Sequence, residues 1–199
     1  MIGTLAISGY RSLRDLVLPL DRLNLVTGAN GSGKSSLYRA LRLLSDAALN
    51  SVVSSLAREG GLPSTFWAGP ETISRAVRRG DYRVEPTASR KPVSLKLGLA
   101  GETYGYSIDL GYPPPPATAF NLDPAIKREC IWHGGSYRKA AVLVDRRNGF
   151  VSIPSERGEE PLTLTKALSP ADSMLASMAD PQRAPEMLVV RESIRDRNS

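Results

Sequence analysis

The residues best suited to chemistry lie close together near the N-terminus, in the run Gly28-Ala29-Asn30-Gly31-Ser32-Gly33-Lys34-Ser35. Their spacing fits the phosphate-binding pattern Gly-x-x-x-x-Gly-Lys-Ser, here called the P-loop. Glycines let backbone N–H groups approach an anion, and a lysine at this position reaches the β- and γ-phosphates of a nucleotide. The Ser35 hydroxyl is placed to bind Mg²⁺, and Ser36 is a further donor to the α-phosphate. The spacing therefore predicts a site for a magnesium-bound nucleoside triphosphate.

The segments on either side of the P-loop are those that such a site requires. Residues 23–27 are apolar enough to predict a short buried strand, and further strands are expected around residues 5–7 and 16–18, after a turn at 8–12. Beyond the loop, helical spacing relates Leu37, Leu41, Leu44 and Ala48, and it continues through Val52 and Leu56 to Gly60-Gly61. A helix that begins at the loop points its unpaired N–H groups and positive dipole end at the anion.

Beyond residue 60 the pattern changes twice. Gly61-Leu62-Pro63 indicates a loop, and residues 71–79 predict a short basic helix in an otherwise ambiguous stretch. Residues 93–99 alternate apolar with smaller or polar side chains, and strand-like runs follow at 103–110, 126–132, 140–144 and 150–153. Together they predict an antiparallel meander, with a hairpin turn at Asn148-Gly149 and a proline run at 113–116. Residues 162–196 predict helices, the first of them capped by Ser169 with Pro170 in its first turn.

Composition narrows the class of protein. The chain has 199 residues, of which 41% are hydrophobic and 23% charged, as in globular proteins. No apolar run approaches the roughly 20 residues of a membrane span, and the N-terminus has no secretory pattern, so we expect a cytoplasmic protein without a membrane partner. The net charge is +6, and 20 of the 26 basic residues are arginine. This balance permits a nucleic-acid partner, but genomic base composition enriches arginine equally well.

Other candidate residues are few. The lone Cys130 and lone His133 exclude an intrachain disulfide and a zinc site built from these two residue types. We expect His133 to be a structural or surface residue. A basic cluster of Arg75, Arg78, Arg79 and Arg83 is suited to nucleic acid, but a solvated face is the commoner role of such a cluster when no aromatic residues are interleaved.

Two segments together resemble a known family. Residues 4–15 (Thr-Leu-Ala-Ile-Ser-Gly-Tyr-Arg-Ser-Leu-Arg-Asp) and residues 25–37, which include the P-loop, look like the N-terminus of SMC/RecF-like ATPases. The resemblance is closest to the bacterial AAA family ATPases with an ABC-type head, including the OLD-like group, and it is strong over residues 1–48.

The resemblance implies the fold and the residues of the site. It implies a mixed α/β (α+β) P-loop NTPase fold, an ABC-ATPase-type N-terminal lobe with an antiparallel β-meander and C-terminal helices, as one domain over residues 1–199 with parts at 1–60, 93–153 and 162–196. By position, Arg11 matches an arginine that approaches the phosphates, with a solvated turn arginine as the alternative, and Asn30 matches the usual P-loop asparagine. ATP would then contact residues 28–36 and Arg11, with Lys34 as the catalytic residue and Ser35 as the Mg²⁺ ligand.

Several family motifs are missing, however. The apolar run Ala141–Asp145 looks like the strand that carries the metal-binding carboxylates, but Arg146 follows where Glu is needed, and the Asn148-Gly149 turn favours a surface hairpin. Neither a glycine-rich signature motif nor the family glutamine is visible, since the only glutamine is Gln182, beside a proline. We therefore expect the chain to be the N-terminal part of a longer ATPase.

Three functions remain open. The first is an ATPase linked to DNA repair, chromosome maintenance or phage defence, with DNA as a partner and a homodimer whose heads enclose the nucleotide. The second is a non-catalytic, nucleotide-gated DNA-binding or regulatory module. The third is a small-molecule kinase, which would need an arginine-rich lid and an acceptor pocket that the sequence does not reveal.

Overall fold

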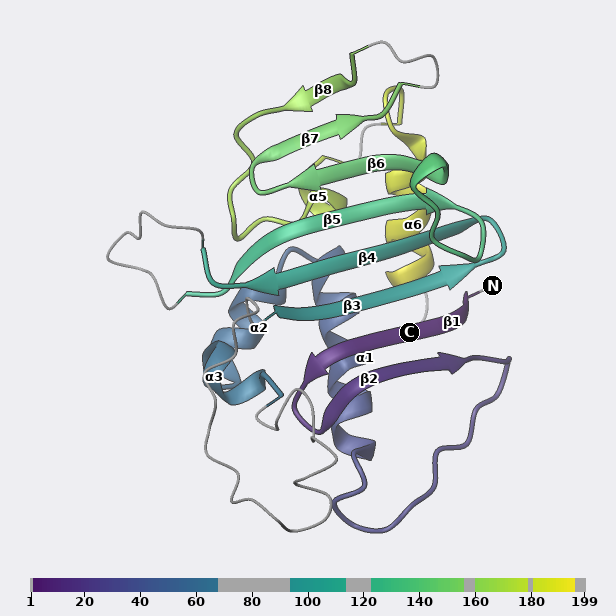
Figure 1. The fold of residues 1–199 in the computed structure, drawn as a ribbon, viewed down its shortest axis with the longest axis vertical. Coiled ribbons are helices and arrows are strands. Elements are labelled where there is room, and N and C mark those ends of the chain that lie inside the picture. The colour runs from purple at the N-terminus through teal and green to yellow at the C-terminus, as the bar shows by residue number, and fades with distance from the viewer. Residues whose placement is uncertain (1, 68–93, 114–122, 156–159, 179–180, 196–199) are drawn as a thin grey trace, which may run out of the picture.

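The described part of the chain is built around one antiparallel β-sheet. A computed structural model describes residues 2–67, 94–113, 123–155, 160–178 and 181–195. The sheet has eight strands in the order β2-β1-β3-β4-β5-β6-β7-β8, and each neighbouring pair is antiparallel. Figure 1 shows the long helices α1 and α6 behind the sheet, so that one face is packed and the opposite face carries no described α-helix. The mixed α/β class expected from the sequence agrees with this arrangement.

The sheet begins with a hairpin of β1 (Ile2–Tyr10) and β2 (Leu13–Pro19), joined by a turn at Arg11 and Ser12. Leu5 and Ile7 of β1 are buried, as expected for alternate strand residues that face the packed side. Tyr10 is also buried, after Gly9 at φ 75° breaks the alternation. Both predicted strands are confirmed. Each is longer than its apolar residues indicate, because backbone pairing continues through polar positions such as the pair Ser8 and Asp15.

The predicted meander over residues 93–153 is also confirmed. Its strands are β3 (Ser94–Gly101), β4 (Tyr104–Gly111), β5 (Ala125–His133), β6 (Val142–Arg147) and β7 (Phe150–Ile153). The turn between β6 and β7 contains Asn148 at φ 53°, a left-handed conformation that asparagine tolerates. A short 3₁₀ turn, η1 (Lys139–Ala141), precedes β6.

The eighth strand corrects the helical prediction for residues 162–196. Residues 162–165 form β8 (Leu162–Thr165), which pairs with β7 at the sheet edge. Its Leu-Thr-Leu-Thr alternation has the period of a strand, and the free edge of β7 supplies the partner that a four-residue strand needs. Helices do follow it, as predicted, later in the segment.

The described helices lie on the packed side of the sheet. They are α1 (Lys34–Ala48), α2 (Val52–Arg58), α3 (Gly61–Thr65), α5 (Met174–Ser177) and α6 (Pro185–Arg195). Helix α1 contacts β1, β3, α2 and α6, so it lies at the centre of the packing. The helix predicted directly after the P-loop is therefore confirmed.

The details of α1 differ from the predicted apolar stripe. Its most buried residues are Ala40, Leu43, Leu44 and Ala47, whereas Leu41 is exposed. These four residues recur every three to four positions and form one face of the helix, and Leu41 lies off that face. The helix also ends before Val52 instead of continuing, because Asn50 takes φ 58° and breaks the hydrogen-bond pattern.

Two loop and cap predictions were wrong. Gly61-Leu62-Pro63 opens the short helix α3, where Pro63 lies in the first turn, so that its missing N–H costs no hydrogen bond. Ser169 does not cap a helix. The cap is Ser173, whose hydroxyl accepts a hydrogen bond from the Leu175 amide at 3.2 Å.

The strand predicted over residues 23–27 does not form. This segment is extended but unpaired, and the side chains of Leu23 and Leu25 are 89% and 88% exposed. A buried strand needs neighbours on its edges and a covered face, and no described strand lies in the sheet beyond β2. The apolar pattern is present in the sequence, but the described residues supply nothing to bury it.

None of the helices that the structure describes has both the length and the apolar character needed to cross a membrane. The predicted helix at 71–79, the basic cluster at residues 75–83 and most of the proline run at 113–116 fall outside the described residues.

Candidate functional site

The P-loop connects the extended segment before it to the N-terminus of α1. Gly31 and Gly33 take φ values of 83° and 96°, which L-residues with a side chain rarely adopt. A Cβ at Gly33 would also lie 3.2 Å from the Ser12 hydroxyl oxygen, so this glycine allows the loop to lie against the β1–β2 turn. No side chain caps α1, which leaves its first amide groups available to an anion.

Lys34 folds back over the loop that precedes it. Its Nζ donates hydrogen bonds to the carbonyl oxygens of Gly28 at 2.5 Å and Ala29 at 2.7 Å, with the Ser32 hydroxyl at 3.5 Å. The ammonium group is therefore held at the mouth of the loop by carbonyl oxygens. Phosphate oxygens are stronger acceptors for a cation than neutral carbonyls, so a bound phosphate could replace these partners.

The two serines after Lys34 differ in their surroundings. Ser35 is exposed in the first turn of α1, where its hydroxyl is accessible to a metal ion. Ser36 instead accepts a hydrogen bond from the Ser12 hydroxyl at 3.0 Å. This bond joins α1 to the turn that contains Arg11, so the structure brings together the two segments that carry the sequence resemblance.

Arg11 is held in the β1–β2 turn, next to Ser12. It has φ 49°, and its backbone N–H donates to the Thr65 carbonyl oxygen at 2.7 Å. Its Nη2 donates to Glu59 Oε2 at 2.7 Å, and its Nε donates to the Tyr10 hydroxyl at 3.3 Å. The hydrogen bond to Glu59 raises the pKa of Arg11, so the guanidinium group stays charged.

Tyr10 completes this arrangement from the core side. Its side chain is fully buried, and its hydroxyl donates to the same Glu59 oxygen at 2.9 Å. Burial and then Glu59 raise the pKa of Tyr10 to about 12, so the phenol remains a donor at neutral pH. One carboxylate oxygen therefore receives two donors, from Tyr10 and Arg11.

A polar groove of about 690 Å³ contains Lys34, Ser35 and Glu59. Its other charged lining residues are Arg39, Arg42 and Asp46 from α1 and Arg58 from α2. Sequence reasoning did not single out these residues. The three-residue spacing of Arg39 and Arg42 on a predicted helix was an available signal, whereas nothing local marks Glu59, which lies 48 positions after Arg11.

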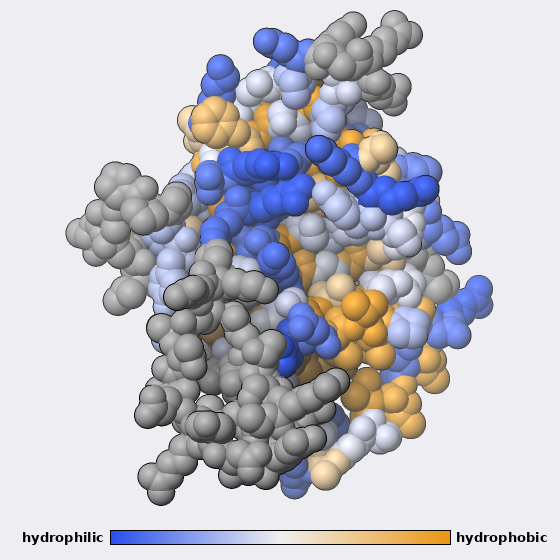
Figure 2. All heavy atoms as spheres, in the orientation of Figure 1, coloured by the Kyte–Doolittle hydropathy of each residue, from blue (hydrophilic) through white to orange (hydrophobic). Residues whose placement is uncertain are grey.

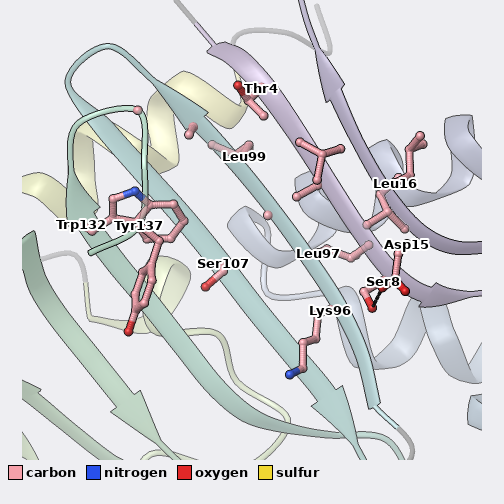
Figure 3. Close-up of a pocket in the computed structure, with 16 residues that line it drawn as sticks. Thr4, Ser8, Asp15, Leu16, Lys96, Leu97, Leu99, Ser107, Trp132 and Tyr137 are labelled. Carbon is pink, nitrogen blue, oxygen red and sulfur yellow. Dashed lines mark hydrogen bonds between the residues drawn. The ribbon is translucent and has the colours of Figure 1, made fainter. Parts of the chain in front are cut away.

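A second, mainly apolar hollow lies on the open face of the sheet. Figure 3 shows it between Leu16 of β2 and the aromatic pair Trp132 and Tyr137, and its polar end carries Asp15 and Lys96. In Figure 2 apolar side chains gather over β1 and β2 on this face. None of the P-loop residues lines this hollow, so it is separate from the polar groove.

The segment Ala141–Asp145, which resembles a strand with metal-binding carboxylates, lies away from the P-loop. Asp145 is on β6, which β3, β4 and β5 separate from β1, and it accepts hydrogen bonds from Arg128 and Arg147 at 2.8 Å each. The hairpin expected for this segment is confirmed, but its position at the surface is not, because Val144, Arg146 and Val151 are fully buried. His133 ends β5 and is exposed, with its ring edge-to-face with Tyr104, which agrees with a surface residue.

Acidic side chains of the described residues do not cluster for a metal ion. Within the described ranges, no group of three His, Cys, Asp or Glu side chains is arranged to hold one. In the polar groove, Asp46 lies eleven residues beyond Ser35 on α1, about 16 Å along the helix axis. The only metal-binding group that the sequence predicted, Ser35, therefore has no carboxylate cluster beside it in the described structure.

Comparison with known proteins agrees with the motif. No curated protein matches the chain. A family model described as AAA ATPase domain matches residues 1–76, the part of the chain that contains the β1–β2 hairpin, the P-loop and helices α1 to α3. This match supports an AAA-type ATPase with a nucleotide-binding P-loop, and it covers 76 of the 199 residues.

Proposed function

We propose that the P-loop binds Mg-ATP and that the complete protein hydrolyses ATP as an SMC/RecF-like ATPase with an ABC-type head. The observation that carries this proposal is the junction of loop and helix. Left-handed Gly31 and Gly33 lead into an uncapped helix N-terminus, with Lys34 folded over the loop. An uncapped helix N-terminus and a cation thus lie at the same end of α1, and the recognition of a triphosphate uses both.

Each residue has a defined part in this proposal. Lys34 exchanges its contacts with Gly28 and Ala29 for oxygens of the β- and γ-phosphates. The uncapped amides of the first turn of α1 donate to the same phosphates. Ser35 fits a magnesium ligand, because its hydroxyl is exposed in the first helical turn. The metal ion, when bound, neutralises phosphate charge. Arg11 lies on the adjacent turn and adds a second cation.

Hydrolysis requires groups that the described residues do not bring to Ser35. The groove carboxylates are Glu59, which Arg11 and Tyr10 engage, and Asp46, which is three turns along α1. In addition, no described residue covers the exposed side chains of Leu23 and Leu25. We therefore propose that further polypeptide packs on this side, buries residues 23–27 and supplies metal-binding carboxylates. By family resemblance, two heads would then enclose ATP in a homodimer in the cytoplasm.

A second candidate is a nucleotide-gated DNA-binding module. It is favoured by the cations of the polar groove, Lys34, Arg39, Arg42 and Arg58, which line one surface beside the P-loop. Four cations along a groove are suited to a nucleic-acid backbone, and such binding weakens steeply with salt. In this candidate the functions in DNA repair, chromosome maintenance or phage defence would depend on binding rather than on turnover.

Calorimetric titration with Mg-ATP tests the proposal. Lys34→Ala should weaken ATP binding by at least about tenfold, because it removes a charge-assisted contact to phosphate. Lys96→Ala is the matched control, since Lys96 is an exposed lysine on the sheet, outside the polar groove. Equal affinity of wild type and Lys34→Ala would contradict nucleotide binding at the P-loop.

The same variant separates the two candidates. ATP turnover by the complete protein that disappears in Lys34→Ala supports the ATPase. DNA binding that survives Lys34→Ala but is lost on combined replacement of Arg39 and Arg42 by Ala supports the binding module, with the salt dependence of affinity as the readout.

A further inference from the structure

The ion pair of Arg11 and Glu59 lies beside the P-loop. The pair has an N–O distance of 2.7 Å, and its side chains are 26% and 19% exposed. Glu59 lines the same groove as Lys34 and Ser35. The Glu59 carboxylate, which is ion-paired with Arg11, thus lies in the same groove as the residues proposed to bind phosphate.

The backbone of Arg11 cannot move far from the P-loop. Its amide is bonded to Thr65 at 2.7 Å, and the next residue, Ser12, is bonded to Ser36 on α1 at 3.0 Å. The β1–β2 turn is further fixed by the bond from the Trp67 amide to the Gly9 carbonyl oxygen at 2.9 Å. A change of hydrogen-bond partner by Arg11, from Glu59 to a phosphate, therefore requires movement of its side chain alone.

Glu59 offers Arg11 the kind of acceptor that a phosphate offers. Its Oε2 accepts from both Arg11 and the buried Tyr10 hydroxyl, and Tyr10 keeps this oxygen in place. Carboxylate and phosphate oxygens both match the planar donor fork of arginine. Because the pair is reached by water, its separation is inexpensive, and a terminal phosphate with more negative charge can compete for the guanidinium.

We propose that Glu59 holds Arg11 away from the P-loop, and that the terminal phosphate of a bound nucleoside triphosphate takes Arg11 from Glu59. Glu59 is then a positioning residue that sets the preference for triphosphate over diphosphate. This inference rests on the proposed nucleotide site. A diphosphate, which lacks the terminal group, leaves Arg11 on Glu59.

The test compares the affinities for Mg-ATP and Mg-ADP by calorimetry. Glu59→Gln keeps the shape of the side chain and a hydrogen-bond acceptor but removes its charge. Beyond any change common to both nucleotides, it should raise the preference for ATP over ADP by roughly two- to fivefold, the strength of a part-exposed ion pair. Asp46→Asn is the matched control, because Asp46 lines the same groove and forms no ion pair with Arg11.

Asp46→Asn should change the affinities for ATP and ADP by the same factor, since it removes a groove charge without touching Arg11. Asparagine keeps an Oδ1 that accepts the Ser51 hydrogen bond, which is 3.4 Å long. Arg11→Met should lower the ATP-to-ADP preference, and Glu59→Gln should have no further effect on the preference in the Arg11→Met background. Cooperative unfolding of each variant establishes that it folds. If Arg11→Met does not fold, the ATP-to-ADP preferences of Glu59→Gln and Asp46→Asn are still compared, and their difference tests the inference.

Two results would overturn the inference. One is an unchanged ATP-to-ADP preference in Glu59→Gln, which would leave the Arg11–Glu59 contact a structural tie between the turn and α2. The other is an equal rise in preference in Asp46→Asn. Failure of the nucleotide site itself has a different signature, since wild type would then bind neither nucleotide or would bind both independently of Lys34.

Discussion

Glu129 on β5 and Arg146 on β6 are direct partners in the sheet register, and neither side chain has exposed surface. Arg146 Nη1 donates to Glu129 Oε2 at 2.5 Å and also to the Asp172 carbonyl oxygen, while Nη2 donates to the Ser169 carbonyl oxygen at 2.8 Å. Glu129 in turn accepts from the hydroxyls of Tyr106 and Ser173, at 2.7 Å each. The pair therefore joins the segment 169–173 to the centre of the sheet.

Removal of either charge from this pair should destabilise the fold strongly. Arg146→Met leaves the Glu129 carboxylate buried without its counter-ion, and we expect a loss of about 3–5 kcal/mol in the free energy of unfolding. Urea denaturation measures this loss. Arg147→Met is the control, because Arg147 is exposed and should lose no more than about 1 kcal/mol. Similar losses in the two variants would show that the buried pair is not a main anchor.

Gly105 should not tolerate a side chain. A Cβ at this position would lie 2.2–2.5 Å from three atoms of the Trp132 indole, which covers Gly105 from the neighbouring strand. Gly105→Ala should cost about 1–3 kcal/mol and change the fluorescence of Trp132. Gly3→Ala, also in a strand but with no atom within 4 Å of its Cβ, should be within about 0.5 kcal/mol of wild type. A neutral Gly105→Ala would mean that the indole lies elsewhere.

The apolar side chain of Leu25 should contribute almost nothing to the stability of this chain. Leu25→Ala should change the free energy of unfolding by less than about 0.5 kcal/mol, because the side chain remains in water. Leu44→Ala on α1 should cost about 2–5 kcal/mol, since Leu44 is buried in the core. A large loss in Leu25→Ala would instead indicate that a further element covers residues 23–27.

The buried thiol of Cys130 should make stability depend on pH under alkaline conditions. Burial, and then the nearby Asp145 carboxylate, raise the pKa of Cys130 to about 11 from 9.0. Because the folded state holds the proton more tightly, this contribution is complete below pH 9 and is lost as the pH rises towards 11. Cys130→Ala should therefore flatten the decline of stability between pH 9 and 11 by about 2 kcal/mol at most. Denaturation midpoints of wild type and Cys130→Ala, measured across this pH range, test the prediction. An equal decline of stability in the two proteins would contradict it.

Local patterns in the sequence were sufficient for most of the elements. Alternation predicted β3, and strand-like runs with the Asn148-Gly149 turn predicted β4 to β7. The helical spacing after residue 34 predicted α1, because one face of the helix is apolar where it packs. β8 was missed, since four residues at an edge carry too little pattern. Residues 23–27 show the opposite failure, in which a clear apolar pattern stays exposed, because burial depends on a neighbour and not on the segment itself.

The candidate site also combines residues that the sequence predicted with contacts that only the tertiary structure shows. The sequence by itself determined the P-loop, because glycine, lysine and serine at fixed spacing carry their chemistry in a single turn of chain. Only the tertiary structure decided that Arg11 contacts Glu59, that Ser12 meets Ser36, and that three arginines share the groove of Lys34. The first two contacts join residues that are 48 and 24 positions apart, and such separations close only when a hairpin and helices pack on a common core.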